Sequence, residues 1–428
     1  MKLRIVHVAK VAGISGAENH LLLLLPALRA RGHDVGLLML HEGEPGAAEL
    51  ADRLEVVGVP VERFRMRAAV DPFVFGRLFR AIRRLRPDVL HTHLVHADFH
   101  GLPAGRLARV PLLVSTKHGF NPFRGRRPFA AADRTVARLA HLHIAISAGL
   151  ARYLAESEGF QEDGFEIVHY GLDPGPPPPA PPGVPRLALV GRLIEIKGHG
   201  VLLEALARAR AELPDVTLEL AGDGPLEPEL RAAVARLELA EAVRFLGHVA
   251  PPTPVYERAE IVAVPSFGEG FGMVALEAME RGRAVIASDV GGLPEIVEAG
   301  ETGLIVPPGD AAALARAIVE LGRDPARTAR LGAAGRERAL SEFSQERCTA
   351  RTEELYLAAL ETGARRRSRT STHARSSAKA ASRESRTSRS APWNRRSRSC
   401  STRSRCGARS SPRGASSRSP RCSSRSTR

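Results

Sequence analysis

The chain runs twice through an alternation of short apolar segments and longer stretches with helical spacing. The first alternation begins at LRIVHVA (3–9) and the second at RLALVGR (186–192). Short apolar runs are typical of buried parallel strands, and their regular alternation with helices favours a doubly wound α/β sheet. Between the halves, GPPPPAPPG (175–183) can be neither helix nor central strand, so we expect a semi-rigid connector there.

The same patterns give the expected element and domain boundaries. Further strands are expected at 35–40, 88–92, 112–116, 142–146, 216–222, 243–247, 261–265, 284–288 and 303–307. Helices are expected at 17–30, at 310–342 and at 343–362, the last of which could pack back on the first domain. The expected parts are a first domain (1–174), a linker (175–185), a second domain (186–342), a returning helix (343–363) and a tail (364–428).

Positive charge is concentrated in that tail. Residues 364–428 contain 19 Arg, one Lys and one acidic residue, a net charge of +19. Of the chain's 62 basic and 47 acidic residues, 42 and 46 lie in 1–363, which therefore has a net charge of −4. With almost no large apolar residues, the tail is expected to be disordered. Either it binds nucleic acid non-specifically or a membrane surface, or it is out-of-frame sequence, since the chain has 57 Arg against 5 Lys.

The sequence gives no sign of secretion or membrane insertion. Outside the tail the one cysteine is Cys348, and no cysteine spacing indicates a disulfide framework or a zinc site, which favours a reducing compartment. No signal peptide precedes the first strand, and the longest apolar run, 21–25, is far short of the ~20 residues that a membrane helix needs. We expect a cytoplasmic protein, with peripheral contact at the inner face of the membrane as an option.

The segment EGFGMVALE (269–277) carries the strongest chemical signal. The run IVAVPS (261–266) predicts a buried strand that enters a glycine-rich loop holding Glu269, and Glu277 follows on the next helix. In open α/β sheets, ligands bind at the carboxyl ends of strands. Loop amides at a helix start suit phosphate, and acidic side chains suit sugar hydroxyls. A nucleotide sugar contains both phosphate and sugar hydroxyls, so it is the ligand that this segment indicates.

A second segment supplies positive charge. GRLIEIKG (191–198) follows the first strand of the second half and places Arg192 and Lys197 five residues apart. Two cations there suit a diphosphate leaving group as its negative charge develops; the alternative is a pair of solvated surface cations. Residues 1–363 contain no Asp-x-Asp metal motif, so we expect side chains to neutralise the phosphates and no metal or cofactor to take part.

In the first half, glycine and histidine are the candidates. ISGAE (14–18) opens a helix after a strand, so the amides near Gly16 could face a phosphate or an acceptor, or the glycine could serve only a tight turn. His91 and His93 resemble a metal pair, but no third ligand at suitable spacing is evident. His118 ends an apolar strand and could bond a sugar hydroxyl or a phosphate; the alternative is a loop histidine.

Other segments allow two interpretations each. Glu295 could contact a ligand, but we favour a structural role at a helix start, where it suits the helix dipole. ERFRMR (62–67), PFVFGRLFRAIRRLR (72–86) and FRGRRPF (123–129) mix Arg with Phe. Such a surface suits docking on anionic lipid, or it belongs to an ordinary Arg-rich helix whose phenylalanines pack inward.

Taken together, the chain resembles the retaining glycosyltransferases of family 4, whose GT-B fold has two Rossmann-like domains facing each other across a cleft. The resemblance covers about residues 1–362 and excludes the tail. The residues that carry it are Gly16, His118, Arg192, Lys197, Glu269 and Glu277.

The resemblance implies a role for each of these residues. Arg192 and Lys197 would bind the donor diphosphate, Glu277 would contact the ribose, and Glu269 would contact the hydroxyls of the donor sugar. The remaining expected site residues are Gly16 beside the diphosphate, His118 beside the transferred sugar, and Phe271, Gly272 and Met273, whose amides would approach the phosphate and sugar.

The implied reaction transfers a hexose from a nucleotide diphosphate sugar, UDP- or GDP-linked, to a glycan, glycolipid or lipid-linked acceptor in cell-envelope or polysaccharide biosynthesis. The leaving phosphate would assist deprotonation of the acceptor on the front face. The alternatives are an inverting GT-B transferase or epimerase, with His20 or Glu18 as base, or a nucleic-acid-binding protein acting through the tail. A two-carboxylate glycosidase has no need of the cations at 192 and 197.

Overall fold

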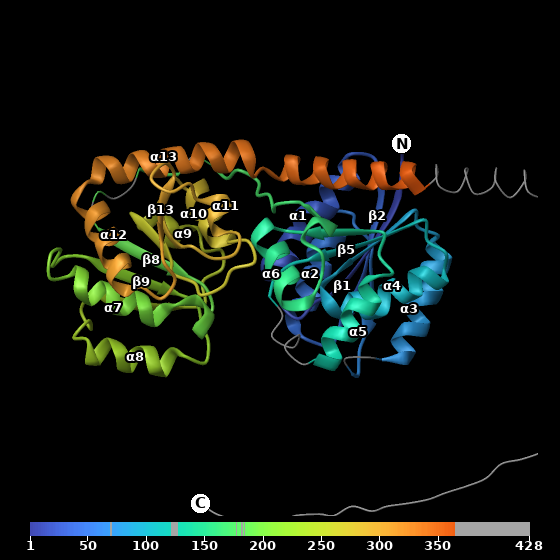
Figure 1. The fold of residues 1–428 in the computed structure, drawn as a ribbon, viewed down its shortest axis with the longest axis horizontal. Helices are drawn as coiled ribbons and strands as arrows, with labels where there is room; N and C mark the ends of the chain where they lie inside the picture. Colours follow the sequence, from blue (N-terminus) through green and yellow to red (C-terminus); the bar gives the residue numbers. More distant parts are fainter. Residues whose placement is uncertain (69–70, 121–126, 177, 181–182, 184, 364–428) are drawn as a thin grey trace, which may run out of the picture. The chain divides into compact units, whose positions relative to one another are not determined.

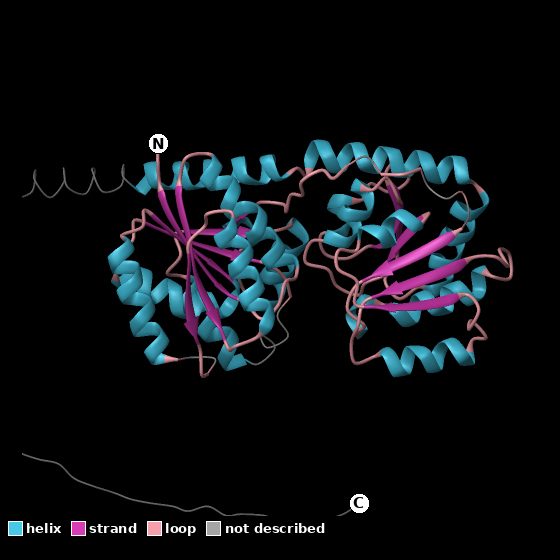
Figure 2. Cartoon of the chain, turned by 180° about the vertical axis from the view of Figure 1, so that it is seen from behind, coloured by secondary structure: helices cyan, strands magenta, loops and turns pink. Residues whose placement is uncertain are grey.

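The structure is a computed structural model that describes residues 1–428 except 69–70, 121–126, 177, 181–182, 184 and 364–428. Within the described residues, the strands form two parallel sheets, and helices flank the strands of each sheet (Figures 1 and 2). The prediction of two doubly wound α/β halves is therefore confirmed. The predicted disorder of the tail concerns residues outside the described part of the chain.

The first sheet has the strand order β3-β2-β1-β4-β5-β6-β7, so its order reverses between β1 and β4. Its strands are β1 (Arg4–Lys10), β2 (Asp34–His41), β3 (Val61–Arg65), β4 (Val89–His93), β5 (Leu112–Lys117), β6 (Leu142–Ala145) and β7 (Phe165–Ile167). The helices of this half are α1 (Gly16–Ala30), α2 (Pro45–Val56), α3 (Pro72–Leu85), α4 (Leu94–Leu107), α5 (Arg127–Ala137) and α6 (Ala148–Glu158).

The second sheet has the order β10-β9-β8-β11-β12-β13 and reverses between β8 and β11. Its strands are β8 (Arg186–Val190), β9 (Thr217–Ala221), β10 (Val243–Gly247), β11 (Ile261–Val264), β12 (Ala284–Ser288) and β13 (Gly303–Val306). Its helices are α7 (His199–Ala209), α8 (Glu227–Arg236), α9 (Thr253–Arg258), α10 (Met273–Glu280), α11 (Leu293–Ile296), α12 (Ala311–Arg323) and α13 (Pro325–Glu342). A short 3₁₀ helix, η3 (Glu195–Lys197), follows β8.

Each sheet is buried on both faces, which explains why the central strands are continuous apolar runs rather than alternating ones. In β11 every residue is buried, as in β4, β5 and β12. Strands β3 and β7 were not predicted, because they lie at opposite edges of the first sheet and are short and partly polar. An edge strand buries too little of its length to leave a clear apolar signal.

The helical region expected over 310–342 is two helices rather than one. The break lies at Asp324, whose side chain accepts a hydrogen bond from the amide of Arg327 and so caps α13. Pro325 occupies the first helical position, where its missing N–H costs nothing. A proline that continued α12 would remove a helical hydrogen bond, so the Asp-Pro pair ends one helix and starts the next.

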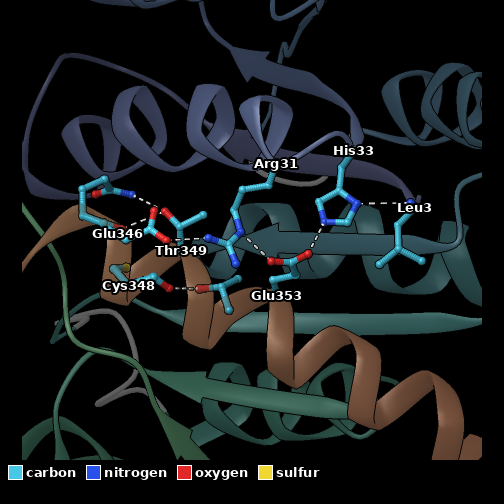
Figure 3. A network of polar contacts seen from close by, with 9 residues as sticks. Leu3, Arg31, His33, Glu346, Cys348, Thr349 and Glu353 are labelled. Carbon is cyan, nitrogen blue, oxygen red and sulfur yellow. Dashed lines mark hydrogen bonds and ion pairs between the residues drawn. The ribbon is translucent and has the colours of Figure 1, made fainter. Parts of the chain in front are cut away.

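The last helical residues, 345–363, pack against the first half of the chain. Leu355 and Tyr356 join the apolar core of the first sheet. In Figure 3, the Glu353 carboxylate accepts hydrogen bonds from Arg31 Nε at 2.5 Å and from His33 Nε2 at 2.8 Å. His33 is held in place because its Nδ1 accepts from the Leu3 amide. This helix therefore returns from the second half to the first.

The described residues of the proline-rich connector are tied to the second half. The amide of Gly183 donates to Glu260 at 2.8 Å. Arg283, which is fully buried, donates to the Pro179 carbonyl, and Arg281 donates to that of Pro176. These contacts hold a segment that has few amide donors of its own.

For the Arg- and Phe-containing segments, the two interpretations are a lipid-docking surface or phenylalanines that pack inward, and the structure supports each in part. Phe64 of 62–67 is buried in the core, and the rings of Phe75 and Phe79 pack partly against the same core. On α3, however, Phe73 is 80% exposed, beside the exposed arginines of the helix. Residues 123–126 of the third segment lie outside the described residues. No helix in the described part of the chain is both long and apolar enough to cross a bilayer.

Candidate active site

The predicted donor residues lie where the strand order of the second sheet reverses. Arg192 and Lys197 follow β8, and Glu269 follows β11, the neighbouring strand on the other side of the reversal. The carboxyl ends of such neighbouring strands diverge toward different helices and leave room for a ligand. The sheet topology therefore brings together side chains that are 72 residues apart in sequence.

Lys197 and Glu269 form a direct, two-armed ion pair. Lys197 Nζ donates to Glu269 Oε2 at 2.7 Å and to Oε1 at 3.0 Å. The side chains are only 22% and 12% exposed, so the pair is partly withdrawn from water. Arg192 is exposed and forms no ion pair within the described residues. Lys197 is therefore not a freely solvated surface cation, because it is fixed against a carboxylate. The exposed Arg192 fits either interpretation.

Two glycines of one loop, 221–225, set the position of the Arg192 loop. Gly222 has φ +146°, and a Cβ there would lie 1.9 Å from the carbonyl oxygen of Gly191. Gly224 has φ +157°, and a Cβ there would lie 2.4 Å from the carbonyl oxygen of Leu193, whose amide donates to the Asp223 carbonyl at 2.7 Å. Neither the backbone conformation nor the space admits a side chain. The AGDGP segment thus supports the loop that carries Arg192.

Gly222→Ala is therefore expected to displace the Arg192 loop and lower affinity for the donor. The added Cβ clashes with backbone, which cannot rotate away, so we expect a stability loss of about 1–3 kcal/mol as well. Gly200→Ala is the matched control, because a Cβ at Gly200 meets nothing within 4 Å and the residue lies in α7. That variant should be neutral or more stable by up to ~1 kcal/mol. Thermal denaturation without and with donor measures the stability and the donor binding of each variant. Equal changes in Gly222→Ala and Gly200→Ala would contradict the role of Gly222 in supporting the Arg192 loop.

The loop that carries Glu269 is clamped from behind. Gly291 has φ +54°, and its backbone lies so close to Glu269 that a Cβ would meet the Glu269 carbonyl oxygen at 1.7 Å. The amide of Gly292 donates to that same carbonyl at 3.2 Å. Phe271 is 2% exposed and packs in the core, so its side chain anchors the loop.

Glu277 lies one turn into α10, which begins after Gly272 in a left-handed conformation. Its Oε2 accepts a hydrogen bond from the hydroxyl of the buried Tyr256 at 2.7 Å. Burial raises the pKa of Glu277, and the bond from Tyr256 opposes that rise. The structure does not bring Glu277 into contact with the Lys197–Glu269 pair.

Residues of the first half approach the same loop. A Cβ on Gly270 would lie 3.1 Å from the main-chain oxygen of His118, and one on Gly16 would lie 3.9 Å from Met273. Ser147 Oγ donates to the Gly270 carbonyl at 2.5 Å. The predicted first-domain residues Gly16 and His118 therefore lie against the predicted donor loop.

Glu295 has a structural role, as favoured, but not the one expected. Its carboxylate accepts from the amides of Ala148 at 3.0 Å and Gly149 at 2.8 Å, the first residues of α6. His169 Nε2 also lies 2.8 Å from it. The negative charge therefore complements the N-terminus of a helix in the first half rather than that of its own helix.

The structure corrects one expectation about the histidines. His91 and His93 do have a third neighbour with ligating atoms: His7 pairs with His91 in the register of β1 and β4, and the ligand atoms of the three rings lie within 4.8 Å of one another. No sequence spacing could reveal it, because His7 is on another strand. His7 Nδ1 and His93 Nε2 are 2.8 Å apart, which is a hydrogen-bond distance. Around a tetrahedral metal ion with bonds of about 2 Å, two ligand nitrogens would be more than 2.8 Å apart. The spacing of His7 and His93 therefore fits a hydrogen bond between the rings rather than two ligands of one ion.

Two partners of site residues carry no sequence signal. Tyr256 supports Glu277, and Tyr170 bonds Nδ1 of His118. Both tyrosines are buried among apolar residues, where the sequence presents them as ordinary core aromatics. Their hydroxyls find these partners only through the fold.

The comparisons with known proteins agree with this architecture. The family model for "Glycosyltransferase Family 4" matches residues 14–175, and that for "Glycosyl transferases group 1" matches 184–324. The chain is 30% identical to the glycogen synthase of Mycobacterium tuberculosis over 389 residues, covering 81% of this chain and 92% of the relative. It is 33% identical over 340 residues to the phosphatidyl-myo-inositol mannosyltransferase of Mycobacterium leprae, covering 75% and 87%.

Solved structures show the same fold. Anabaena HepE in complex with UDP and glucose superimposes with a TM-score of 0.73 at 24% identity, covering 83% of this chain and all of that one. A glycosyltransferase from Rickettsia africae gives a TM-score of 0.72 at 21% identity, covering 84% and 99%. The predicted GT-B fold is confirmed. The chain belongs to the group 1, family 4 glycosyltransferases.

Proposed function

We propose that this protein transfers a hexose, with retention and without a metal ion, from a UDP- or GDP-linked sugar to a glycan, glycolipid or lipid-linked acceptor. The observation that carries the proposal is the Lys197–Glu269 pair at the strand reversal of the second sheet, together with the exposed Arg192 on the same loop after β8. A sugar diphosphate needs both a carboxylate for hydroxyls and cations for phosphate, and the arrangement supplies them side by side.

The donor would lie across the loop 269–273. Arg192 can bind the diphosphate with two parallel N–H bonds, and Lys197 can add a compact charge while it still contacts Glu269. The first amides of α10 suit phosphate oxygens, and Glu277 would accept from the ribose hydroxyls. A UDP-type donor is supported by the likeness to HepE, whose structures hold UDP, glucose or UDP-glucose.

Retention is proposed because neither candidate base of the first half is well suited to take the acceptor proton. Glu18 accepts from the amide of Ser15 at 3.1 Å and from its hydroxyl, and so caps α1. Burial lowers the pKa of His20 to about 4, which makes it a weak base. Without a base, a phosphate oxygen of the leaving group would take the acceptor proton. The bond from sugar C1 to phosphate then breaks, and the bond from C1 to the acceptor oxygen forms on the same face.

Two cationic side chains make metal independence chemically reasonable. The charge that develops on the departing diphosphate can be met by Lys197, which Glu269 holds in place, and by the exposed Arg192. Closure of the two halves over the donor would exclude water and disfavour hydrolysis.

The acceptor is proposed from the relatives and from the first half of the chain. Relatives include a glycogen synthase and a phosphatidyl-myo-inositol mannosyltransferase, so both glycan and lipid-linked acceptors occur among them. The exposed Phe73 and the exposed arginines of α3 suit an anionic membrane surface, although Arg84 is paired with Glu62. Co-sedimentation of residues 1–363 with anionic vesicles tests this; absence of binding removes the membrane contact.

A thermal-shift panel of UDP-, GDP- and ADP-sugars tests the donor. We expect one nucleotide class to raise the melting temperature, by an amount that grows with ligand concentration as binding to the folded state requires. The Lys197→Ala variant should lose most of that shift. Equal, concentration-independent responses to all three classes would contradict a donor site.

Glu277→Gln is expected to lose donor affinity while gaining stability at neutral pH. Because the folded-state pKa of Glu277 is raised, the acid favours the folded state when protonated. The stability that the protonated carboxyl contributes is fully present below about pH 4.3, the pKa of glutamate in the unfolded chain. It is lost as the pH rises through the pKa of Glu277 in the folded state. Glutamine mimics the protonated acid, so the stability difference, variant minus wild type, should increase between pH 4 and 7. Urea titrations across that range measure it, and a difference that falls would contradict the assignment.

A further inference from the structure

The buried His7 and His93 and the partly buried His118 form a linear chain of hydrogen bonds next to the proposed site. Nδ1 of His7 lies 2.8 Å from Nε2 of His93, and Nδ1 of His93 lies 2.8 Å from Nε2 of His118. Nδ1 of His118 in turn bonds the hydroxyl of Tyr170. The chain thus runs from the middle of β1, across the end of β4, to the residue after β5 that faces the Gly270 loop.

We propose that this chain fixes His118 in one ring orientation and in the Nε2–H tautomer, with Tyr170 and His93 as positioning residues for the transfer reaction. The catalytic part of this inference rests on the proposed function and on the role that the family resemblance implies for His118, beside the transferred sugar. The tautomer itself does not depend on that function and can be measured without a substrate.

Burial makes every ring in the chain neutral at physiological pH. Burial lowers the pKa of His7 to about 3, and it lowers those of His93 and His118 well below their usual value. A neutral imidazole has one N–H donor and one bare nitrogen that accepts. Since each ring in the middle uses both nitrogens, all bonds in the chain must run in the same direction, and only two arrangements exist.

Counting unpaired groups separates the two arrangements. If Tyr170 donates to His118, then His118 Nε2–H donates to His93, and His93 Nε2–H donates to His7. The only group left over is Nε2–H of His7, which is buried and has no partner among the described residues. In the reverse direction, His7 Nε2 is again unpaired, and the buried Tyr170 hydroxyl also has no acceptor within the described residues. The first arrangement leaves one unpaired polar group and the second leaves two, so the first is favoured.

This arrangement determines what His118 presents to the site. Both ring nitrogens are engaged within the first half, whereas the main-chain oxygen of His118 lies next to Gly270. The ring therefore acts as an anchor that holds the His118 backbone against the donor loop. Tyr170 also lies 3.8 Å from the Cβ position of Gly16, so one side chain supports both first-half residues of the proposed site.

Tyr170→Phe in the full-length chain tests the proposal, because it removes the hydroxyl and keeps the ring. Tyr356→Phe is the matched control. Tyr356 is equally buried, and its hydroxyl bonds Nδ1 of His91 at 2.6 Å. The other nitrogen of His91 bonds Thr116 Oγ1, so His91 stands outside the chain that ends at His118. Each variant loses one buried tyrosine–histidine hydrogen bond, and their melting temperatures should fall by similar amounts.

Long-range ¹H–¹⁵N spectra of histidine-labelled protein report the tautomer directly. In the wild type and in Tyr356→Phe, we expect His118 as the Nε2–H form, and in Tyr170→Phe a mixture of both forms. We also expect Tyr170→Phe to lower kcat about tenfold, the rate equivalent of one hydrogen bond, with little change in KM for the donor. Tyr356→Phe should stay within about twofold of wild type.

Two results would overturn the proposal. An Nδ1–H form of His118 in the wild type would show that the chain runs in the other direction. Equal losses of kcat in the two variants would show that Tyr170 has a structural role only. If the wild type transfers no sugar from any donor but shows the Nε2–H form, the proposed function fails while the assigned tautomer stands.

Discussion

Lys197→Ala is expected to lower kcat/KM for the donor by about 10²- to 10³-fold, the effect of removing one positioned charge from a developing anion. The side chain is held by Glu269 at 2.7 and 3.0 Å and is mostly shielded from water, which strengthens its field at the site. Glu269→Ala should be similarly inactive, because it removes the proposed sugar contact and leaves Lys197 without its partner. Steady-state kinetics measure these losses, and circular dichroism checks that both variants remain folded.

Arg323→Ala is the control for the loss of an ion pair as such. Arg323 bonds Glu212 at 2.8 Å, but both side chains are more than half exposed and lie away from the proposed donor residues. Surface pairs of this kind contribute little, so activity and stability should remain near wild type. Wild-type turnover in Lys197→Ala or Glu269→Ala would refute the assignment of the donor site.

Asp98→Asn is expected to destabilise the protein by about 3–5 kcal/mol, the cost of breaking a buried ion pair from one side. Asp98 is fully buried on α4, and its Oδ2 accepts from Lys117 Nζ at 2.6 Å and from Ser115 Oγ at 3.0 Å. Lys117 is 2% exposed, so the substitution leaves its amino group buried without a carboxylate beside it. Thermal denaturation should show a fall of about 10 °C.

The double variant Asp98→Asn/Lys117→Met separates charge from packing. Thr92 and Ser115 donate to different oxygens of Asp98. Asparagine keeps one acceptor oxygen for one of these hydroxyls, and its NH2 group can donate to the oxygen of the other. Methionine fills the space of the lysine stem without a charge. We expect this variant to recover most of the lost stability, since replacing a whole buried pair is often nearly neutral. A double variant as unstable as Asp98→Asn would show that the charge is not the cause. Because Lys117 precedes His118, the pair also helps to fix the end of β5.

The central part of the fold could be predicted from the sequence because burial on both faces leaves an unbroken apolar run, as in 261–264 and 284–288. The signal fails where burial is partial. The edge strands 61–65 and 165–167 mix charged and apolar residues, so they were not predicted. The break at Asp324 was missed because the helical periodicity continues on both sides of it, although its Asp-Pro pair is a recognisable start signal.

The candidate site could be predicted only as far as strand ends determine it. Arg192, Lys197 and Glu269 follow strands of one sheet, so their proximity follows from the topology. The pairing of Lys197 with Glu269 depends on loop geometry that glycines at 198, 222 and 291 impose through backbone contacts, and no local pattern encodes it. Likewise, the histidine chain joins residues of β1 and β4 with the residue after β5 through strand register, which the sequence does not reveal.

The configuration of the product tests the account most directly. With an α-linked nucleotide sugar as donor, proton NMR of the initial product should show an α-glycosidic linkage, since the acceptor is proposed to attack from the face that the phosphate leaves. The candidate bases Glu18 and His20 are, respectively, engaged in a helix cap and weakly basic. A β-linked initial product would contradict retention and require a base that is correctly placed in the first half of the chain.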